Sequence, residues 1–65
     1  MAGYLLTKRN NVPLLTGSIV HYRKTPAYIR LMDEKSGWVY IVTMDERAEH
    51  LRVFPSNIGA KWFQS

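Results

Sequence analysis

The chain has 65 residues, no cysteine, and nine Lys and Arg against five Asp and Glu, which gives a formal charge of +4. Its length predicts one domain, residues 1–65, and the missing cysteines exclude disulfides and thiolate metal sites. A hydrophobic content of 46% is too high for a disordered chain, and no apolar run approaches a membrane span. We therefore expect a folded cytoplasmic protein with no membrane contact.

Turn signals divide the first half of the chain. The apolar run at residues 4–6 is expected to pair as an edge strand or to remain loose, and residues 9–13 have the Asn and Pro composition of a turn. Residues 18–23 alternate in polarity and predict a strand, with Arg23 at its end on the outward face. Pro26 then predicts a break, because proline has no backbone N–H for a strand ladder.

Residues 27–32 alternate most regularly and predict the clearest strand of the chain. Ala27, Ile29 and Leu31 share one face, which we expect to be buried. The residues expected on the opposite, outward face are Tyr28, Arg30 and Met32.

The longest uncharged run of β-branched and aromatic residues occupies residues 38–43. A half-buried strand would alternate apolar with polar residues, so this run predicts a central strand covered on both faces. The charged segments on either side, residues 33–37 and 44–49, have the composition of hairpin loops. Residues 50–54 predict the strand that follows the second loop.

The last part of the chain predicts a tight turn and a final short strand. Pro55 ends the preceding strand, residues 56–59 suit one turn of 3₁₀ helix, and residues 60–63 return as a strand. Closely spaced strands with turn signals and without helical periodicity predict an all-β fold, a small barrel of about five antiparallel strands.

Two segments of the second half resemble an SH3 domain. Residues 52–58 run from a strand into Pro-Ser-Asn, as in the Pro-Ser-Asn-Tyr 3₁₀ turn of that family, and Gly37-Trp38 is similar to the start of its central strand. The resemblance implies an SH3-like barrel. By position it also matches Trp38, Pro55 and Asn57 to the family's proline-recognition surface. The family's groove-lining Tyr is replaced by Ile58 and its Ala-Leu-Tyr-Asp-Tyr run is absent, so the proline-peptide site is not matched.

Basic and aromatic residues interleave on the outward positions of the predicted strands. An exposed ring beside an arginine is what base stacking and phosphate contact require. If the three strands that carry them are neighbours, their arginines form a stripe. The expected binding residues are Arg23, Tyr28, Arg30, Trp38, Arg52 and Phe54. The alternative interpretation is that the rings cover a barrel end and the arginines only solvate it.

Catalytic and metal-binding patterns are missing from the sequence. His21 and His50 are far apart, and without cysteine they are too few for a zinc site. No serine lies in a nucleophile elbow, and no glycine-rich phosphate loop occurs. We therefore expect a protein without enzymatic activity, cofactor or metal.

Two functions remain open at this point. The leading hypothesis is a non-catalytic module that binds nucleic acid, DNA or RNA, in a regulatory role in a prokaryote or phage. The competing hypothesis is an adaptor or regulator that binds another protein, or a second copy of itself to form a homo-oligomer, through an aromatic patch rimmed by arginines. Binding to phosphate weakens steeply as salt rises, whereas association through an aromatic patch does not, so salt separates the two hypotheses.

Overall fold

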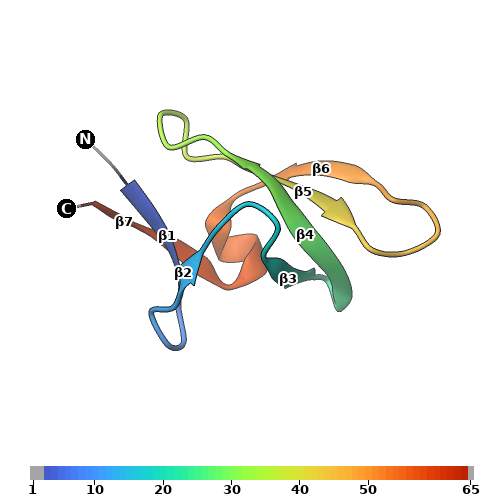
Figure 1. The fold of residues 1–65 in the computed structure, drawn as a ribbon, viewed down its shortest axis with the longest axis horizontal. Helices are drawn as coiled ribbons and strands as arrows, with labels where there is room; N and C mark the ends of the chain where they lie inside the picture. The colour runs from blue at the N-terminus through green and yellow to red at the C-terminus, as the bar shows by residue number, and fades with distance from the viewer. Residues whose placement is uncertain (1–2, 65) are drawn as a thin grey trace.

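The computed structural model describes residues 3–64, which form seven β-strands and one 3₁₀ turn (Figure 1). The elements are β1 (Gly3–Thr7), β2 (Pro13–Leu14), β3 (Ile19–Tyr22), β4 (Thr25–Met32), β5 (Val39–Thr43), β6 (His50–Val53), η1 (Pro55–Ile58) and β7 (Ala60–Gln64). The all-β class and the 3₁₀ turn predicted from the sequence are confirmed. Within these residues no helix is long and apolar enough to cross a membrane.

The strands form two antiparallel sheets. One sheet has three strands in the order β2-β1-β7, and the other has four in the order β3-β4-β5-β6. The first and last strands pair along their whole length, so the two ends of the described chain lie side by side (Figure 1). Both sheets contribute to one core, in which the largest fully buried side chains are Leu5, Ile29, Val39 and Ile41.

Strand β5 is central, as its apolar run predicts. Val39 and Ile41 are completely buried in the core. Val42 points to the other face of the sheet and is also buried, because in the register it lies between Tyr28 of β4 and His50 of β6. On that second face only Val42 is buried, whereas Trp38 and Tyr40 are half-buried, so the prediction of a strand covered on both faces holds for Val42 alone.

Strand β4 contains an irregularity that the alternating sequence does not reveal. Ile29 faces Ile41, but the next residue of β5, Tyr40, faces Leu31, so Arg30 is an extra residue on β4. Such a β-bulge shifts the alternation by one position. The prediction for the end of this strand was therefore wrong. Leu31 is exposed, and Met32 packs against the core.

The β3–β4 hairpin also differs from its prediction. Pro26 does not break the chain but lies within β4, opposite His21. Antiparallel pairs alternate between hydrogen-bonded and non-hydrogen-bonded, and the bond from the Ile29 N–H to the Ser18 carbonyl places Pro26 in a non-hydrogen-bonded pair. Its missing N–H therefore costs no bond to β3.

The 3₁₀ turn joins the two sheets and is fixed by its own residues. The Phe54 N–H donates to Asn57 Oδ1 at 3.1 Å, the Asn57 N–H donates to the Phe54 carbonyl at 2.9 Å, and Gly59 ends the turn at φ 66°. Strand β7 then brings Trp62 against the core, where its Nε1–H donates to the Gly37 carbonyl at 2.9 Å. A buried indole normally finds such a partner, and a core position for Trp62 is what its size predicts.

Candidate functional site

The side of the four-stranded sheet that faces away from the core is here called the outer face. The register places on it Tyr28, Val42 and His50 in one cross-strand row, and Tyr40 and Arg52 in the next. The other members are Ile19, His21, Pro26, Arg30, Leu31, Trp38 and Phe54. Five of the six residues expected to bind a partner therefore share this face, namely Tyr28, Arg30, Trp38, Arg52 and Phe54.

Trp38 is the centre of a three-layer stack at one end of the outer face. The rings of Trp38 and Phe54 lie 4.1 Å apart with an interplanar angle of 16°, and the guanidinium carbon of Arg52 lies 4.3 Å from the Trp38 ring. Two groups this close to one ring cannot share a side of it. Arg52 and Phe54 are two residues apart on the chain, a spacing of roughly 6–7 Å along an extended strand, which suits one ring between them.

The stack covers both ring faces of Trp38. With Arg52 on one side and Phe54 on the other, neither π-face of Trp38 is free for a base or another ring. Its structural effect is to hold both neighbours in fixed positions, and the ring face left open is that of Phe54, which is 53% exposed. Fixed arginines and aromatic rings lose little conformational freedom when they bind a partner.

Arg30 makes the second contact between a cation and a ring on the outer face. Its guanidinium carbon lies 5.6 Å from the ring centre of Tyr40, within the distance of a cation–π interaction. The bulge places Arg30 there, since Arg30 and Leu31 together oppose Tyr40. Tyr40 was not among the expected binding residues. The sequence feature that indicates a binding role for Tyr40 is its alternate position in the central strand. An outward Tyr at this position lies beside the outward residues of both neighbouring strands.

The charge of the outer face has one sign. It carries Arg30 and Arg52, whereas all five carboxylates lie in the two hairpin loops beyond the ends of β5. Within residues 3–64, no side-chain hydrogen bond uses an arginine or a lysine as its donor. The guanidinium groups are therefore positioned by rings and keep their N–H donors available.

Arg23 does not join the other two arginines. It lies in the turn between β3 and β4, and its guanidinium carbon is 5.3 Å from the ring of Tyr22, which packs against the core side of the sheet. With Asp45 and Glu49 it lines a hollow of about 250 Å³ at that end of the fold. The predicted stripe of three arginines is thus a pair on the outer face and a separate cation at the hairpin tip.

The β5–β6 loop beside this hollow is held by hydrogen bonds to one carboxylate. Asp45 Oδ1 accepts from the Thr43 hydroxyl at 2.9 Å and from the backbone N–H groups of Arg47 and Ala48 at 3.2 and 3.1 Å. The Thr43 hydroxyl in turn accepts from the Glu49 N–H at 2.8 Å. These bonds, first of all the one from Thr43, lower the pKa of Asp45 from its ordinary 3.8. The Asp45 carboxylate therefore stabilises the conformation of this loop.

The positions matched to a proline-recognition surface have structural roles here. Pro55 is buried, and the Asn57 side chain closes the 3₁₀ turn. Trp38 has both ring faces occupied.

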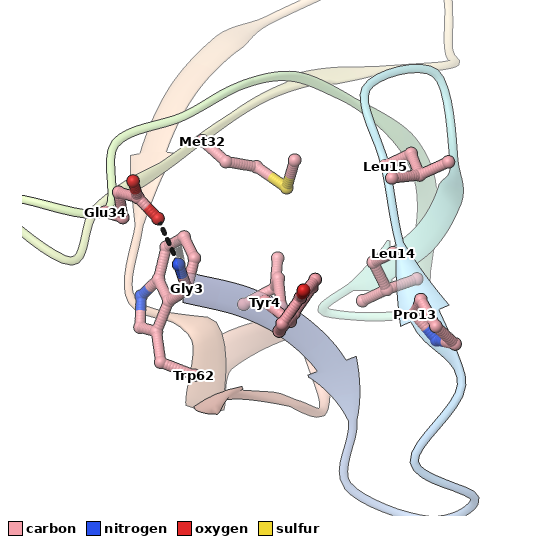
Figure 2. Close-up of a pocket in the computed structure, with 9 residues that line it drawn as sticks. Gly3, Tyr4, Pro13, Leu14, Leu15, Met32, Glu34 and Trp62 are labelled. Atoms are coloured by element: carbon pink, nitrogen blue, oxygen red, sulfur yellow. Dashed lines mark hydrogen bonds between the residues drawn. The ribbon is translucent and has the colours of Figure 1, made fainter. Parts of the chain in front are cut away.

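An apolar cavity of about 200 Å³ lies between the three-stranded sheet and the end of β4 (Figure 2). Tyr4, Leu15, Met32 and Trp62 are among the residues that line it, and the Gly3 N–H donates to Glu34 Oε2 at 2.6 Å on its rim. None of the residues expected to bind a partner lines this cavity. It is therefore separate from the outer face.

Within residues 3–64 no group of three or more His, Asp or Glu side chains is arranged to hold a metal ion. Comparison with known proteins finds no family, no curated protein and no solved structure that matches this chain.

Proposed function

We propose that the outer face binds single-stranded nucleic acid. The observation that carries the proposal is the pair of arginines, Arg30 and Arg52, each held against a ring on a face without carboxylates, next to the exposed ring of Phe54. Guanidinium groups bind phosphate oxygens, and an exposed ring stacks on a base of any sequence. These contacts support a role in binding.

A single strand suits this face better than a duplex. A duplex hides the faces of its bases, whereas an unpaired strand can place them on Phe54 and Tyr28, both of which are exposed. Of the grooves of a duplex, the major groove admits a helix or a two-stranded ribbon, and this face is one side of a four-stranded sheet. DNA and RNA are both expected ligands, since no contact proposed here depends on the 2′-hydroxyl.

We also infer an SH3-like arrangement of the two sheets. The inference is supported by the order of the last three elements, in which β6 leads through a Pro-Ser-Asn 3₁₀ turn into β7, and by the pairing of β7 with β1. A fold of this kind does not define a function by itself, so the proposal of nucleic-acid binding rests on the outer face alone.

The test is fluorescence anisotropy with labelled single-stranded DNA and RNA of mixed sequence, in low salt and over a salt series. Binding through two arginines and stacked bases predicts a linear fall of log K with log salt whose slope increases by about 0.7 for each phosphate contact. The variant Arg30→Ala/Arg52→Ala should bind weakly, and its salt slope should fall by about 1.4, which is 0.7 for each lost phosphate contact. Folded wild-type protein that binds neither DNA nor RNA in low salt would refute the proposal.

One observation favours protein binding as a second candidate function. Ile19 and Leu31, both about half exposed, add aliphatic surface beside the rings of the outer face. Aromatic and aliphatic anchors rimmed by arginine are common at protein interfaces. This candidate predicts that a protein partner is captured equally well at low salt, at moderate salt and after nuclease treatment. Nucleic-acid binding predicts instead that capture is lost at moderate salt and after nuclease treatment.

A further inference from the structure

The tip of the β3–β4 hairpin has an unusual backbone for its residues. Tyr22 pairs with Thr25, so the turn consists of Arg23 and Lys24 alone, and both have positive φ, 48° and 67°. Positive φ at both central residues is the conformation of a type I′ turn, which strongly favours Asn-Gly. At these two positions any residue with a Cβ lowers the stability of the fold, because the left-handed conformation crowds the Cβ against the following carbonyl oxygen.

Elsewhere in the described residues, positive φ occurs at three glycines, Gly17, Gly37 and Gly59, and at Asn11 and Ala48. At the hairpin tip, two adjacent positions of the same kind are both cations. Strain of this sort persists where it has a function, and here the property that the two residues share is their positive charge.

The two cations lie beyond the end of the outer face, at the tip of the β3–β4 hairpin. Lys24 is exposed, and Arg23 is held over the Tyr22 ring, with Asp45 and Glu49 across the hollow offsetting part of its charge. From Lys24 to Arg30 the chain follows one strand, so the tip lies roughly 20 Å from Arg30. Between them, the outer positions of β4 are Pro26 and the exposed ring of Tyr28, with no carboxylate.

We propose that Arg23 and Lys24 form a second phosphate-binding site for the same single strand, reached after it crosses Tyr28 from the Arg30–Arg52 pair. The proposal rests on the proposed function of the outer face. In this proposal the strained turn binds the ligand, and the binding site extends from Arg30 and Arg52 to the hairpin tip. A strand of about four nucleotides occupies one end only, whereas about twelve nucleotides reach both contacts.

The decisive variant replaces the tip by the residues that its backbone favours, Arg23→Asn with Lys24→Gly. This change relieves the strain and removes two charges. The melting temperature should rise, while the affinity for a twelve-nucleotide oligothymidylate should fall about tenfold and the salt slope by about 1.4, which is 0.7 for each lost phosphate contact. Affinity for the four-nucleotide oligomer should stay within about twofold of wild type.

Two control variants separate the contact from its general effects. Lys8→Gln with Arg9→Gln removes the same charge at the turn between β1 and β2 and should leave the salt slope unchanged. Ala48→Gly relieves a positive φ of 48° in the β5–β6 loop without a change of charge, so it should raise the melting temperature and leave binding unchanged.

The outcomes distinguish this proposal from the one on which it rests. If the Arg30→Ala/Arg52→Ala variant loses binding but the tip variant binds the longer oligomer like wild type, the tip is not a contact and the outer face is. An equal loss for the Lys8→Gln/Arg9→Gln control would also overturn the tip site, because net charge alone would then explain the effect. If wild type binds no oligomer, both proposals fail.

Discussion

Replacing Phe54 by leucine tests the stacking role of the outer face. The side chain is 53% exposed, and its ring stacks on Trp38 at 4.1 Å. Leucine keeps most of the apolar area in contact with Trp38 and removes the aromatic stack. The stack contributes about 1 kcal/mol to the free energy of unfolding. In a domain of this size that corresponds to a fall in melting temperature of about 4–8 °C, which leaves the protein folded at room temperature.

The expected effect on binding is larger than the effect on stability. A base stacked on an aromatic ring contributes about 1–3 kcal/mol, so Phe54→Leu should weaken binding by a factor between about 5 and 150. The slope of log K against log salt should remain that of wild type, because a phenyl ring displaces no counterions from phosphate. Anisotropy titrations at three or more salt concentrations measure both quantities.

The chain offers a matched control for this substitution. Phe63 is 52% exposed and lies on the three-stranded sheet, paired with Tyr4. Phe63→Leu removes the same ring at the same exposure from a surface that carries no expected contact, and it should leave the affinity unchanged. Wild-type affinity in Phe54→Leu, or an equal loss in Phe63→Leu, would show that the Phe54 ring does not stack on a base.

Three further predictions concern the outer-face arginines, Asp45 and the bulge in β4. Arg30→Ala should change the free energy of unfolding by no more than about 0.5 kcal/mol, and Arg52→Ala by about 1 kcal/mol because it uncovers a face of Trp38, while each lowers the salt slope by about 0.7. The pKa of Asp45 is lowered in the folded state, so the carboxylate stabilises the fold fully above its ordinary pKa of 3.8, and this stabilisation is lost as pH falls through the lower pKa of the folded state. In an acid titration followed by circular dichroism, Asp45→Asn should therefore lose less folding stability below about pH 4 than wild type does. Deleting Arg30 should leave a melting temperature close to that of Arg30→Ala, because the strand then regains a regular ladder with Leu31 outward.

Most of the strands could be predicted because they have a local signal; β2 (Pro13–Leu14) could not, because residues 9–13 have the composition of a turn. The uncharged run at residues 38–43 indicated burial on both faces, and Val39, Ile41 and Val42 are buried as expected. The Pro-Ser-Asn sequence indicated the 3₁₀ turn, which forms at Pro55–Ile58. These features depend on side-chain periodicity and turn preference over a few residues, and such information is present in the sequence.

Contacts between strands could not be predicted in the same way. The sandwich of Trp38 between Arg52 and Phe54 depends on the register of β5 against β6, and the contact of Arg30 with Tyr40 depends on a bulge in β4. Alternation shows which residues share a face within one strand. It does not show how two strands are aligned or whether one of them contains an extra residue.

The two places where local rules failed are both at cations of the same strand and its hairpin. Arg23 was expected on a strand and lies in a turn whose backbone disfavours it, and Arg30 was expected in a regular ladder and is the extra residue of a bulge. Preferred residues would put Asn-Gly at the tip, which is the more stable solution there, and a regular ladder would have no extra residue in β4. Departures from local preference that agree in chemistry are a sign of function more than of folding. Both departures position a cation, and the anionic ligand proposed for the outer face accounts for both of them.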